Sequence, residues 1–189
     1  MSDTTLKDSN PASSTLLCQR DNYLQRLIRC RNNGLIKTVT GIRRCGKSVL
    51  LSTIFHNWLV KNGVDDNHII DIAFDDMDRE QLKNPHSFLD FVKARMSGKN
   101  IYYILLDEVQ MMDNFSGVLL SLLHIRNCDI YVTGSNSRFL STDIVTEFRG
   151  RSQEIRMQPL TFSEYYSAVG GDKTDAWRQY YLMEVCHSC

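Results

Sequence analysis

The sequence predicts an α/β fold in which a parallel sheet of five strands carries helices on both faces. Three observations support this prediction. Short apolar, β-branched runs alternate along the chain with segments of helical periodicity, which is typical of strands wound by helices. The first of these runs leads into a glycine-containing loop and then a helical pattern. A later run is so apolar that it suits a central strand buried on both faces, and it ends in two acids.

The expected elements follow one another in a regular order. Residues 1–14 are polar and nearly without apolar periodicity, so we expect a disordered tail before one domain that spans 15–189. An amphipathic helix over 20–31 opens that domain. The remaining elements alternate: a strand over 36–40, a helix over 47–61, a strand over 68–74, a helix over 85–96, a strand over 101–107, a helix over 115–126, a strand through Thr133, a helix near Arg138 and a strand over 153–157.

The segment Gly41–Ser48 is a complete G-x-x-x-x-G-K-[ST] phosphate-binding loop. In such a loop the glycines let backbone N–H groups close around a β-phosphate, Lys47 spans the β- and γ-phosphates, and the Ser48 hydroxyl ligates Mg²⁺. The next helix directs the positive end of its dipole at the same anion. The chain is therefore expected to bind a nucleoside triphosphate, through Gly41, Ile42, Arg43, Arg44, Cys45, Gly46, Lys47, Ser48 and Val49.

The strand over 101–107 ends in Asp107 and Glu108. Ligands of open α/β sheets bind at the carboxyl ends of the strands, so these acids are expected beside the phosphate-binding loop. There Asp107 can orient Mg²⁺ while Glu108 accepts a proton from the water that attacks the γ-phosphate, which is the Walker B pattern of hydrolytic NTPases. Taken alone, two acids at a strand end also fit an ordinary solvent-exposed terminus.

Two further segments offer γ-phosphate contacts. The strand through Thr133 ends in small polar residues, among which Ser135 and Asn136 could bond the γ-phosphate or the attacking water, or could simply cap the next helix. Downstream, Arg151, ahead of Arg149, could be an arginine finger in cis or in a neighbouring subunit, or a surface arginine. The expected catalytic set is Glu108, Lys47, Asn136 and Arg151, with Ser48 and Asp107 on the metal.

The order of these motifs resembles that of the AAA+-like ATPases of bacteria and archaea. Their phosphate loop reads Gly-Val/Ile-Arg-Arg-x-Gly-Lys-Ser, and a box Pro-Leu-x-Phe-x-Glu-Tyr lies downstream. The resemblance implies ATP and Mg²⁺ as ligands, a sheet of the additional-strand type and a C-terminal domain of unknown function, and it identifies no client. It runs from about Arg20 to Tyr181, and its matching segments are Gly41–Ser48, Asp107–Gln110, Thr133–Ser135, Gly150–Arg151 and Pro159–Tyr165.

Similar proteins continue beyond the tyrosine-rich helix with a Gly-Gly-Leu/Met-Pro segment, whereas this chain ends in Met183–Cys189. Codons for Met-Glu-Val-Cys-His, read from one base earlier, can encode Tyr-Gly-Gly-Met-Pro. We therefore expect a frameshift that truncates the chain after its ATPase domain and leaves 183–189 out of frame. The terminal Cys186-His187-Ser188-Cys189 cluster then needs no function, and it lacks the second ligand pair of a zinc site.

Composition excludes some partners. The 22 basic and 22 acidic residues give a formal net charge of zero, so no global field favours nucleic acid or a membrane surface. No run reaches the length of a membrane-spanning helix, and 1–14 lacks the apolar core of a signal peptide. The remaining cysteines have no framework spacing. We expect a cytoplasmic protein that binds ATP and acts as a homo-oligomer or on a protein partner.

Three other functions of a phosphate-binding loop compete with ATP hydrolysis. A GTPase needs Asn/Thr-Lys-x-Asp, and the nearest string, Asp172-Lys173-Thr174-Asp175, begins with the wrong residue. A small-molecule kinase shares the loop but has no need of Glu108 directly after Asp107. A nucleotide-operated switch or scaffold with little turnover also fits the motifs.

Overall fold

The computed structural model describes residues 20–135 and 147–187, although the side chains of Ser135 and 183–187 are not described. The chain divides into two compact units, Arg20–Leu160 and a C-terminal unit that is described from Thr161 onward. Among the described residues, the structure contains no helix with the length and apolar character needed to cross a membrane.

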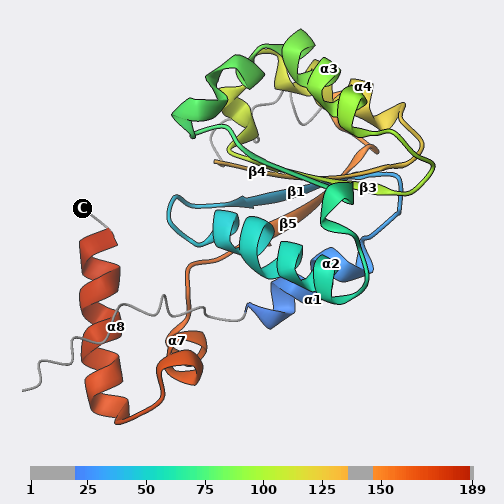
Figure 1. Cartoon of the computed structure of the whole chain (residues 1–189). Helices are drawn as coiled ribbons and strands as arrows, with labels where there is room; N and C mark the ends of the chain where they lie inside the picture. The colour runs from blue at the N-terminus through green and yellow to red at the C-terminus, as the bar shows by residue number, and fades with distance from the viewer. Residues whose placement is uncertain (1–19, 136–146, 188–189) are drawn as a thin grey trace, which may run out of the picture. The chain divides into compact units, whose positions relative to one another are not determined.

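The larger unit is built on one sheet of five parallel strands (Figure 1). Its spatial order is β2-β3-β4-β1-β5, so β2, β3 and β4 follow one another in the sheet as in the chain, while β1 lies between β4 and β5. All four pairings are parallel, and Val39 lies level with Thr133 on one side and with Ile155 on the other. The strands are β1 (Ile36–Gly41), β2 (Ile69–Ala73), β3 (Tyr102–Asp107), β4 (Cys128–Ser135) and β5 (Ser152–Met157).

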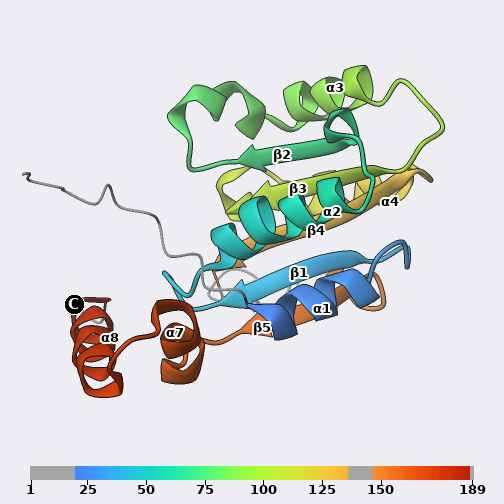
Figure 2. The ribbon, with the colours of Figure 1, turned by 60° about the horizontal axis from the view of Figure 1, so that its bottom comes forward.

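Helices cover both faces of the sheet (Figures 1 and 2). One face carries α3 and α4, and the other carries α1, η1 and α2. Successive residues of a strand point to opposite faces, so Leu106 of β3 packs beneath α3 and α4 while Leu105 packs against the other layer. The bounds of these helices are α1 (Asp21–Arg29), η1 (Val49–Phe55), α2 (His56–Lys61), α3 (Pro85–Arg95) and α4 (Phe115–Leu123).

The predicted fold class is confirmed: a parallel five-stranded sheet lies between two helical layers. Each predicted strand and helix within the described residues is present, with ends that differ by a few residues. The helix expected near Arg138 and the tail over 1–14 lie outside the described residues. Three short 3₁₀ segments were not predicted: η2 (Asp66–His68), η3 (Met77–Lys83) and η4 (Val109–Met111).

The helix after the phosphate-binding loop differs from the expected α-helix. Its first part, η1, has π-helical bonding, and it continues into α2 without a break because Phe55 and His56 keep right-handed helical angles. A π segment in a helix is uncommon and often marks a functional region. Here Ser52 and His56 both hydrogen-bond the carboxylate of Asp71 on β2, at 2.9 and 3.0 Å, which ties this helix to the neighbouring strand.

The C-terminal unit is a pair of helices, α7 (Phe162–Val169) and α8 (Lys173–His187). A capping box begins α7, since the Thr161 hydroxyl accepts from the Glu164 N–H at 3.3 Å while the Glu164 carboxylate accepts from Thr161 N at 2.9 Å. Ring contacts join the two helices, with the centroid of Phe162 4.8 Å from that of Trp177.

Candidate nucleotide site

The candidate site lies at the carboxyl ends of β1, β3 and β4, which are neighbours in the sheet in the order β3-β4-β1. The phosphate-binding loop leaves β1 at Gly41, which lies level with Met157 of β5. A Cβ atom at Gly41 would come within 2.6 Å of the Met157 carbonyl oxygen and 2.8 Å of the Cys45 sulfur. Only glycine therefore fits at the start of this loop.

The loop backbone is shaped as an anion cradle. Arg44 and Gly46 have left-handed φ angles of 65° and 89°, which turn successive N–H groups toward the inside of the loop. Among the described residues, the N–H groups of Arg43, Arg44 and Gly46 donate no hydrogen bond. Unpaired backbone donors in a closed loop are costly unless a ligand or water accepts from them, so this loop suits a phosphate group.

Lys47 is almost fully buried beneath this loop, with 4% of its surface exposed. Its ammonium group donates to two loop carbonyls, Gly41 O at 3.2 Å and Ile42 O at 3.0 Å. Of the ion pairs among the described residues, none includes Lys47. A buried cation held by neutral carbonyls and without a counter-ion is well suited to an anionic ligand.

Within the described residues, Asp107, the last residue of β3, is a buried acid without a cation, as Lys47 is a buried cation without an anion. The side chain is buried and accepts a hydrogen bond from the hydroxyl of Thr133, and the hydroxyl of Ser48 lies near enough to lower its pKa. Burial raises the pKa of this carboxyl, while the two hydroxyls oppose the rise and the nearby Glu108 adds to it. Asp107 also takes part in no ion pair within the described part of the chain. The effect of Ser48 on this pKa indicates that the two predicted metal ligands lie near each other.

Thr133 is a site residue that sequence reasoning missed. Its hydroxyl is fully buried, donates to Asp107 and accepts from the backbone N–H of Glu108 at 3.0 Å. One atom of β4 therefore fixes both acids at the end of β3. The signal in the sequence was the Thr-Gly-Ser run itself, from which Ser135 and the following Asn136 were predicted as contacts instead of Thr133.

Glu108 follows directly in a left-handed conformation, with φ 50° and ψ 45°. That conformation costs a non-glycine residue about 1 kcal/mol and is common at functional sites. It separates the side chain of Glu108 from that of Asp107: the Asp107 carboxylate is buried, whereas Glu108 is half-buried. One Glu108 carboxylate oxygen accepts a hydrogen bond from the side-chain amide of Gln110, which sequence reasoning did not single out as a site residue.

Other predicted site residues have different positions. The side chains of Ile42, Arg43, Arg44 and Val49 are exposed, so any contact of the loop with a nucleotide would use backbone groups there. Cys45 packs inside the loop, and burial raises the pKa of its thiol against the opposing fields of Lys47 and Arg20, which fits a packing role. Asn136 and the side chain of Ser135 lie outside the described residues.

Arg151 does not lie at the carboxyl edge. It precedes β5, and its carbonyl accepts from Ile36 N at 2.9 Å, at the amino end of β1. The six residues of β1 separate it from the loop by roughly 20 Å, at about 3.3 Å per residue. This separation does not favour an arginine finger from Arg151 in cis, and a finger that reaches a neighbouring subunit stays a prediction. Arg151 lies at the amino edge because the chain of a parallel sheet returns to that edge before each strand.

A Mg²⁺ ion fits the donors that are present. Among the described residues there is no cluster of three or more His, Cys, Asp or Glu side chains that could hold a metal. Mg²⁺ does not require such a cluster, because it is commonly bound by one or two protein oxygens together with phosphate oxygens and water. Ser48 and Asp107, which lie near each other, would be those two ligands.

The AAA+-like P-loop NTPase class combines a phosphate-binding loop before a helix, a strand two positions away that ends in a buried Asp and a half-buried Glu, and the sheet order β2-β3-β4-β1-β5. The chain belongs to the AAA domain family, whose profile matches residues 33–166. An uncharacterized protein of Haemophilus influenzae is 33% identical over 160 residues, which are 84% of this chain and 40% of that protein. The chain spans less than half the length of the curated relatives it matches.

Two solved structures illustrate the shared fold. The ORC2 protein of Aeropyrum pernix is 14% identical and superposes with a TM-score of 0.52, covering 85% of this chain and 52% of that one. The Hsp104 chain of a Saccharomyces cerevisiae Hsp104 and casein complex is also 14% identical and gives a TM-score of 0.56, covering 80% and 28%. At this identity the similarity establishes the fold alone.

Proposed function

We propose that this chain binds Mg²⁺ and ATP and hydrolyses the β-γ phosphoanhydride bond. The observation that supports this most strongly is the buried Lys47 ammonium in a loop with unpaired N–H groups, together with the buried Asp107 carboxylate near Ser48 and with Glu108 next in the chain. This arrangement combines an anion cradle, two oxygen ligands for a divalent cation, and a separate carboxylate. The three parts are those that phosphoryl transfer to water requires.

Each residue has a distinct role in this proposal. The loop N–H groups and Lys47 bind the phosphates, and on binding Lys47 exchanges its bonds to loop carbonyls for phosphate oxygens. Ser48 and Asp107 hold Mg²⁺, which supplies charge neutralisation of the phosphates. Glu108, more exposed than Asp107, accepts the proton of the attacking water. The presence of this acid supports a hydrolase over a small-molecule kinase, which transfers phosphate to its own substrate.

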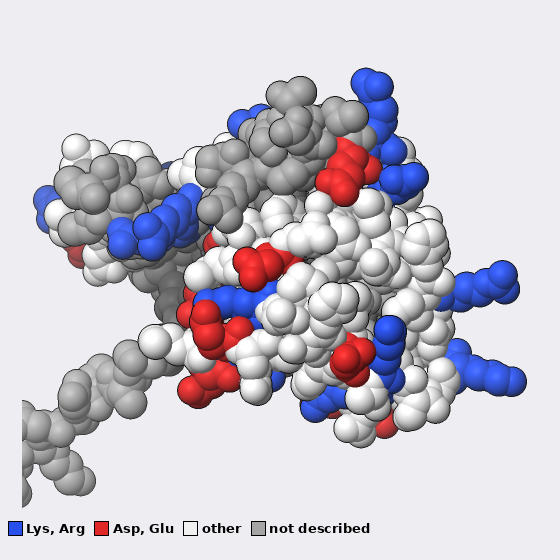
Figure 3. Space-filling view, turned by 90° about the horizontal axis from the view of Figure 1, so that it is seen from above, with Lys and Arg blue, Asp and Glu red and all other residues white. Residues whose placement is uncertain are grey.

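Adenine as the base rests on the family. The Aeropyrum pernix ORC2 structure, which shares this fold, contains ADPNP and ADP, and that supports an adenine nucleotide here. The process that hydrolysis serves would depend on a partner protein or a second copy of the chain. On the face seen in Figure 3, acidic and basic side chains are interspersed, which gives no preference for a polyanion on that face.

The experiment measures nucleotide affinity and phosphate release for three variants. Lys47→Ala removes the ammonium that binds the phosphates, so most ATP affinity should be lost. Glu108→Gln should keep Mg·ATP bound and lower turnover by about 10²- to 10⁴-fold, which is the usual contribution of a positioned general base. Asp107→Ala should in addition weaken the Mg²⁺-dependent part of binding.

Lys61→Ala is the matched control for Lys47→Ala, because Lys61 is an exposed lysine at the end of the same helical segment. It should leave both affinity and turnover unchanged. Full ATP affinity in a folded Lys47→Ala protein would contradict the loop assignment. Normal turnover in Glu108→Gln would contradict the role of that acid as the base.

A further inference from the structure

Gln110 lies in a turn that the core holds firmly in place. The turn η4 follows Glu108, and two backbone bonds close it, from Met111 N to Glu108 O at 2.9 Å and from Met112 N to Val109 O at 3.0 Å. Val109 and Met112 are buried in the core beneath α3 and α4. The backbone of Gln110 is consequently fixed, and its own side chain is buried at the start of this turn.

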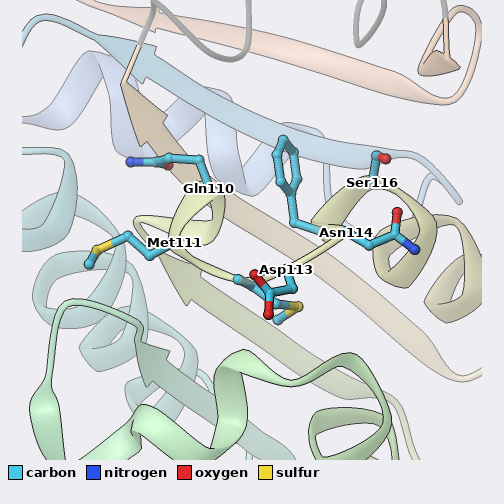
Figure 4. Close-up of a pocket in the computed structure, with 7 residues that line it drawn as sticks. Gln110, Met111, Asp113, Asn114 and Ser116 are labelled. Carbon is cyan, nitrogen blue, oxygen red and sulfur yellow. The ribbon is translucent and has the colours of Figure 1, made fainter.

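The Gln110 side chain extends away from the rest of the turn. A pocket of about 700 Å³ is lined by the residues from Gln110 to Ser116, and Figure 4 shows Gln110 and Ser116 at opposite ends of it. The side-chain nitrogen of Gln110 donates to Oε2 of Glu108. An ionised carboxylate only accepts hydrogen bonds, so the amide must present its NH₂ group to Glu108.

The bond leaves one oxygen of Glu108 available. Among the described residues, Oε2 accepts from Gln110 and Oε1 accepts from no protein group. The backbone of Glu108 is held separately, by the bond from its N–H to Thr133 at 3.0 Å. Two hydrogen bonds therefore hold Glu108, one at its backbone N–H and one at Oε2. Its other carboxylate oxygen, Oε1, takes part in neither.

We propose that Gln110 is a positioning residue, which holds Glu108 by Oε2 so that Oε1 can accept the proton of the attacking water. This role rests on the proposed ATPase function. In the transfer, the water oxygen forms its bond to the γ-phosphorus, the bond from that phosphorus to the bridging oxygen breaks, and ADP leaves with the bond's electrons. The water proton passes to Oε1. Gln110 itself gains and loses no proton.

The test is a double-mutant cycle on steady-state phosphate release and Mg·ATP affinity. Gln110→Met keeps the length of the side chain and removes its donor. It should lower kcat by about 10- to 100-fold, because a small misplacement of a reacting group costs up to about that much, with affinity unchanged within about twofold. In the Glu108→Gln background, Gln110→Met should cause no further loss, since both changes act through one carboxylate.

Two controls accompany the cycle. Gln110→Glu is a second variant that preserves shape and polarity but places a like charge beside Glu108, and it should also lower kcat with nucleotide still bound. Met111→Leu, at an exposed neighbour in the same turn, should leave kcat unchanged. Preserved Mg·ATP affinity shows that each variant is folded.

The outcomes distinguish a failure of the positioning role of Gln110 from a failure of the proposed ATP hydrolysis. Wild-type protein that binds Mg·ATP without releasing phosphate overturns the ATPase proposal, and the role of Gln110 with it. Wild-type turnover together with an unchanged or faster Gln110→Met overturns the positioning role alone. An equal fold-loss of kcat from Gln110→Met in both backgrounds overturns it too, because the side chain would then act independently of Glu108.

Discussion

Asp107 and Asp129 lie at opposite ends of neighbouring strands and are equally buried, each with 3% of its surface exposed. Their surroundings differ. Asp129, at the amino end of β4, pairs with the fully buried Lys37 and also accepts from Tyr131 Oη at 2.9 Å and Asn32 N at 3.0 Å. Asp107, at the carboxyl end of β3, accepts from the Thr133 hydroxyl, lies near the Ser48 hydroxyl and belongs to no ion pair within the described residues.

The contrast indicates that the charge of Asp129 serves the structure, whereas the charge of Asp107 is suited to a ligand. Burying a carboxylate is costly unless a counter-charge and hydrogen bonds compensate, and Asp129 has both within the chain. Burial raises the pKa of Tyr131, and the adjacent Asp129 carboxylate raises it further, so the phenol stays a donor to that carboxylate. Asp107 has hydrogen bonds without a counter-charge, which a divalent cation would supply. Lys47, a buried cation without an anion, is the complementary case in the phosphate-binding loop.

The largest expected effect is on stability, from a change in the buried ion pair of Lys37 and Asp129. Lys37→Met should lower the free energy of unfolding by about 3–5 kcal/mol, because it leaves the Asp129 carboxylate buried without its cation. Chemical denaturation measures this directly. The double variant Lys37→Met/Asp129→Leu should lose less than the sum of the two single changes. Simple additivity would mean that the two charges do not depend on one another.

A smaller effect is expected at Thr133, whose hydroxyl serves the carboxyl-end acids. Thr133→Val should lower stability by about 1–3 kcal/mol, because it leaves the Glu108 N–H without its acceptor. It should also weaken Mg²⁺-dependent ATP binding, since Asp107 loses a hydrogen bond that orients it.

Thr38→Val is the control for Thr133→Val. Thr38 is a buried threonine of β1 and, unlike Thr40, which donates to Glu154, its hydroxyl makes no side-chain hydrogen bond among the described residues. It should change nucleotide binding little. An equal effect of both variants on Mg²⁺-dependent binding would show that the Thr133 hydroxyl has no special relation to the two acids.

The smallest effect concerns His56, which bridges the carboxylates of Asp71 and Asp66. Burial opposes the charging of this ring, but the hydrogen bonds to the two acids outweigh it and raise its pKa above the usual value. The stabilisation is therefore complete below about pH 6.5 and is lost as the pH rises through the raised pKa. His56→Gln should lower Tm by a few °C at pH 6 and by less at pH 9. A loss that grows toward pH 9 would contradict the ionic bridge.

The sequence predicted the sheet and its strands because parallel strands buried on both faces leave a clear pattern, and β3 is the strongest case, with every residue buried. Hydrophobic periodicity placed the helices for the same reason. The π-helical bonding of η1 could not be predicted, since it is a matter of backbone geometry that hydrophobic periodicity does not specify.

The site was predicted to the extent that its chemistry is local in sequence. The phosphate-binding loop is a contiguous motif, and its position at the carboxyl edge follows from the fold. The role of Thr133 depends on the register between β3 and β4, which sets Leu106 level with Val132 and so Asp107 beside Thr133. No single-sequence pattern specifies that register. The place of Arg151 at the amino edge follows from a parallel sheet with a strand directly after that residue, whereas its role toward a neighbouring subunit stays a prediction.

The most direct test of the contrast between the two buried aspartates is the melting temperature of Asp107→Asn and Asp129→Asn, each with and without Mg²⁺ and a non-hydrolysable ATP analogue. Asp107→Asn should melt at the wild-type temperature or a few °C above it without ligand, because a carboxyl whose pKa burial raises gains nothing from its charge, and it should lose the Mg²⁺-dependent part of the shift. Asp129→Asn should melt about 10 °C lower and keep that shift. The opposite result, in which Asp107→Asn is strongly destabilised and retains its Mg²⁺-dependent shift, would contradict the account.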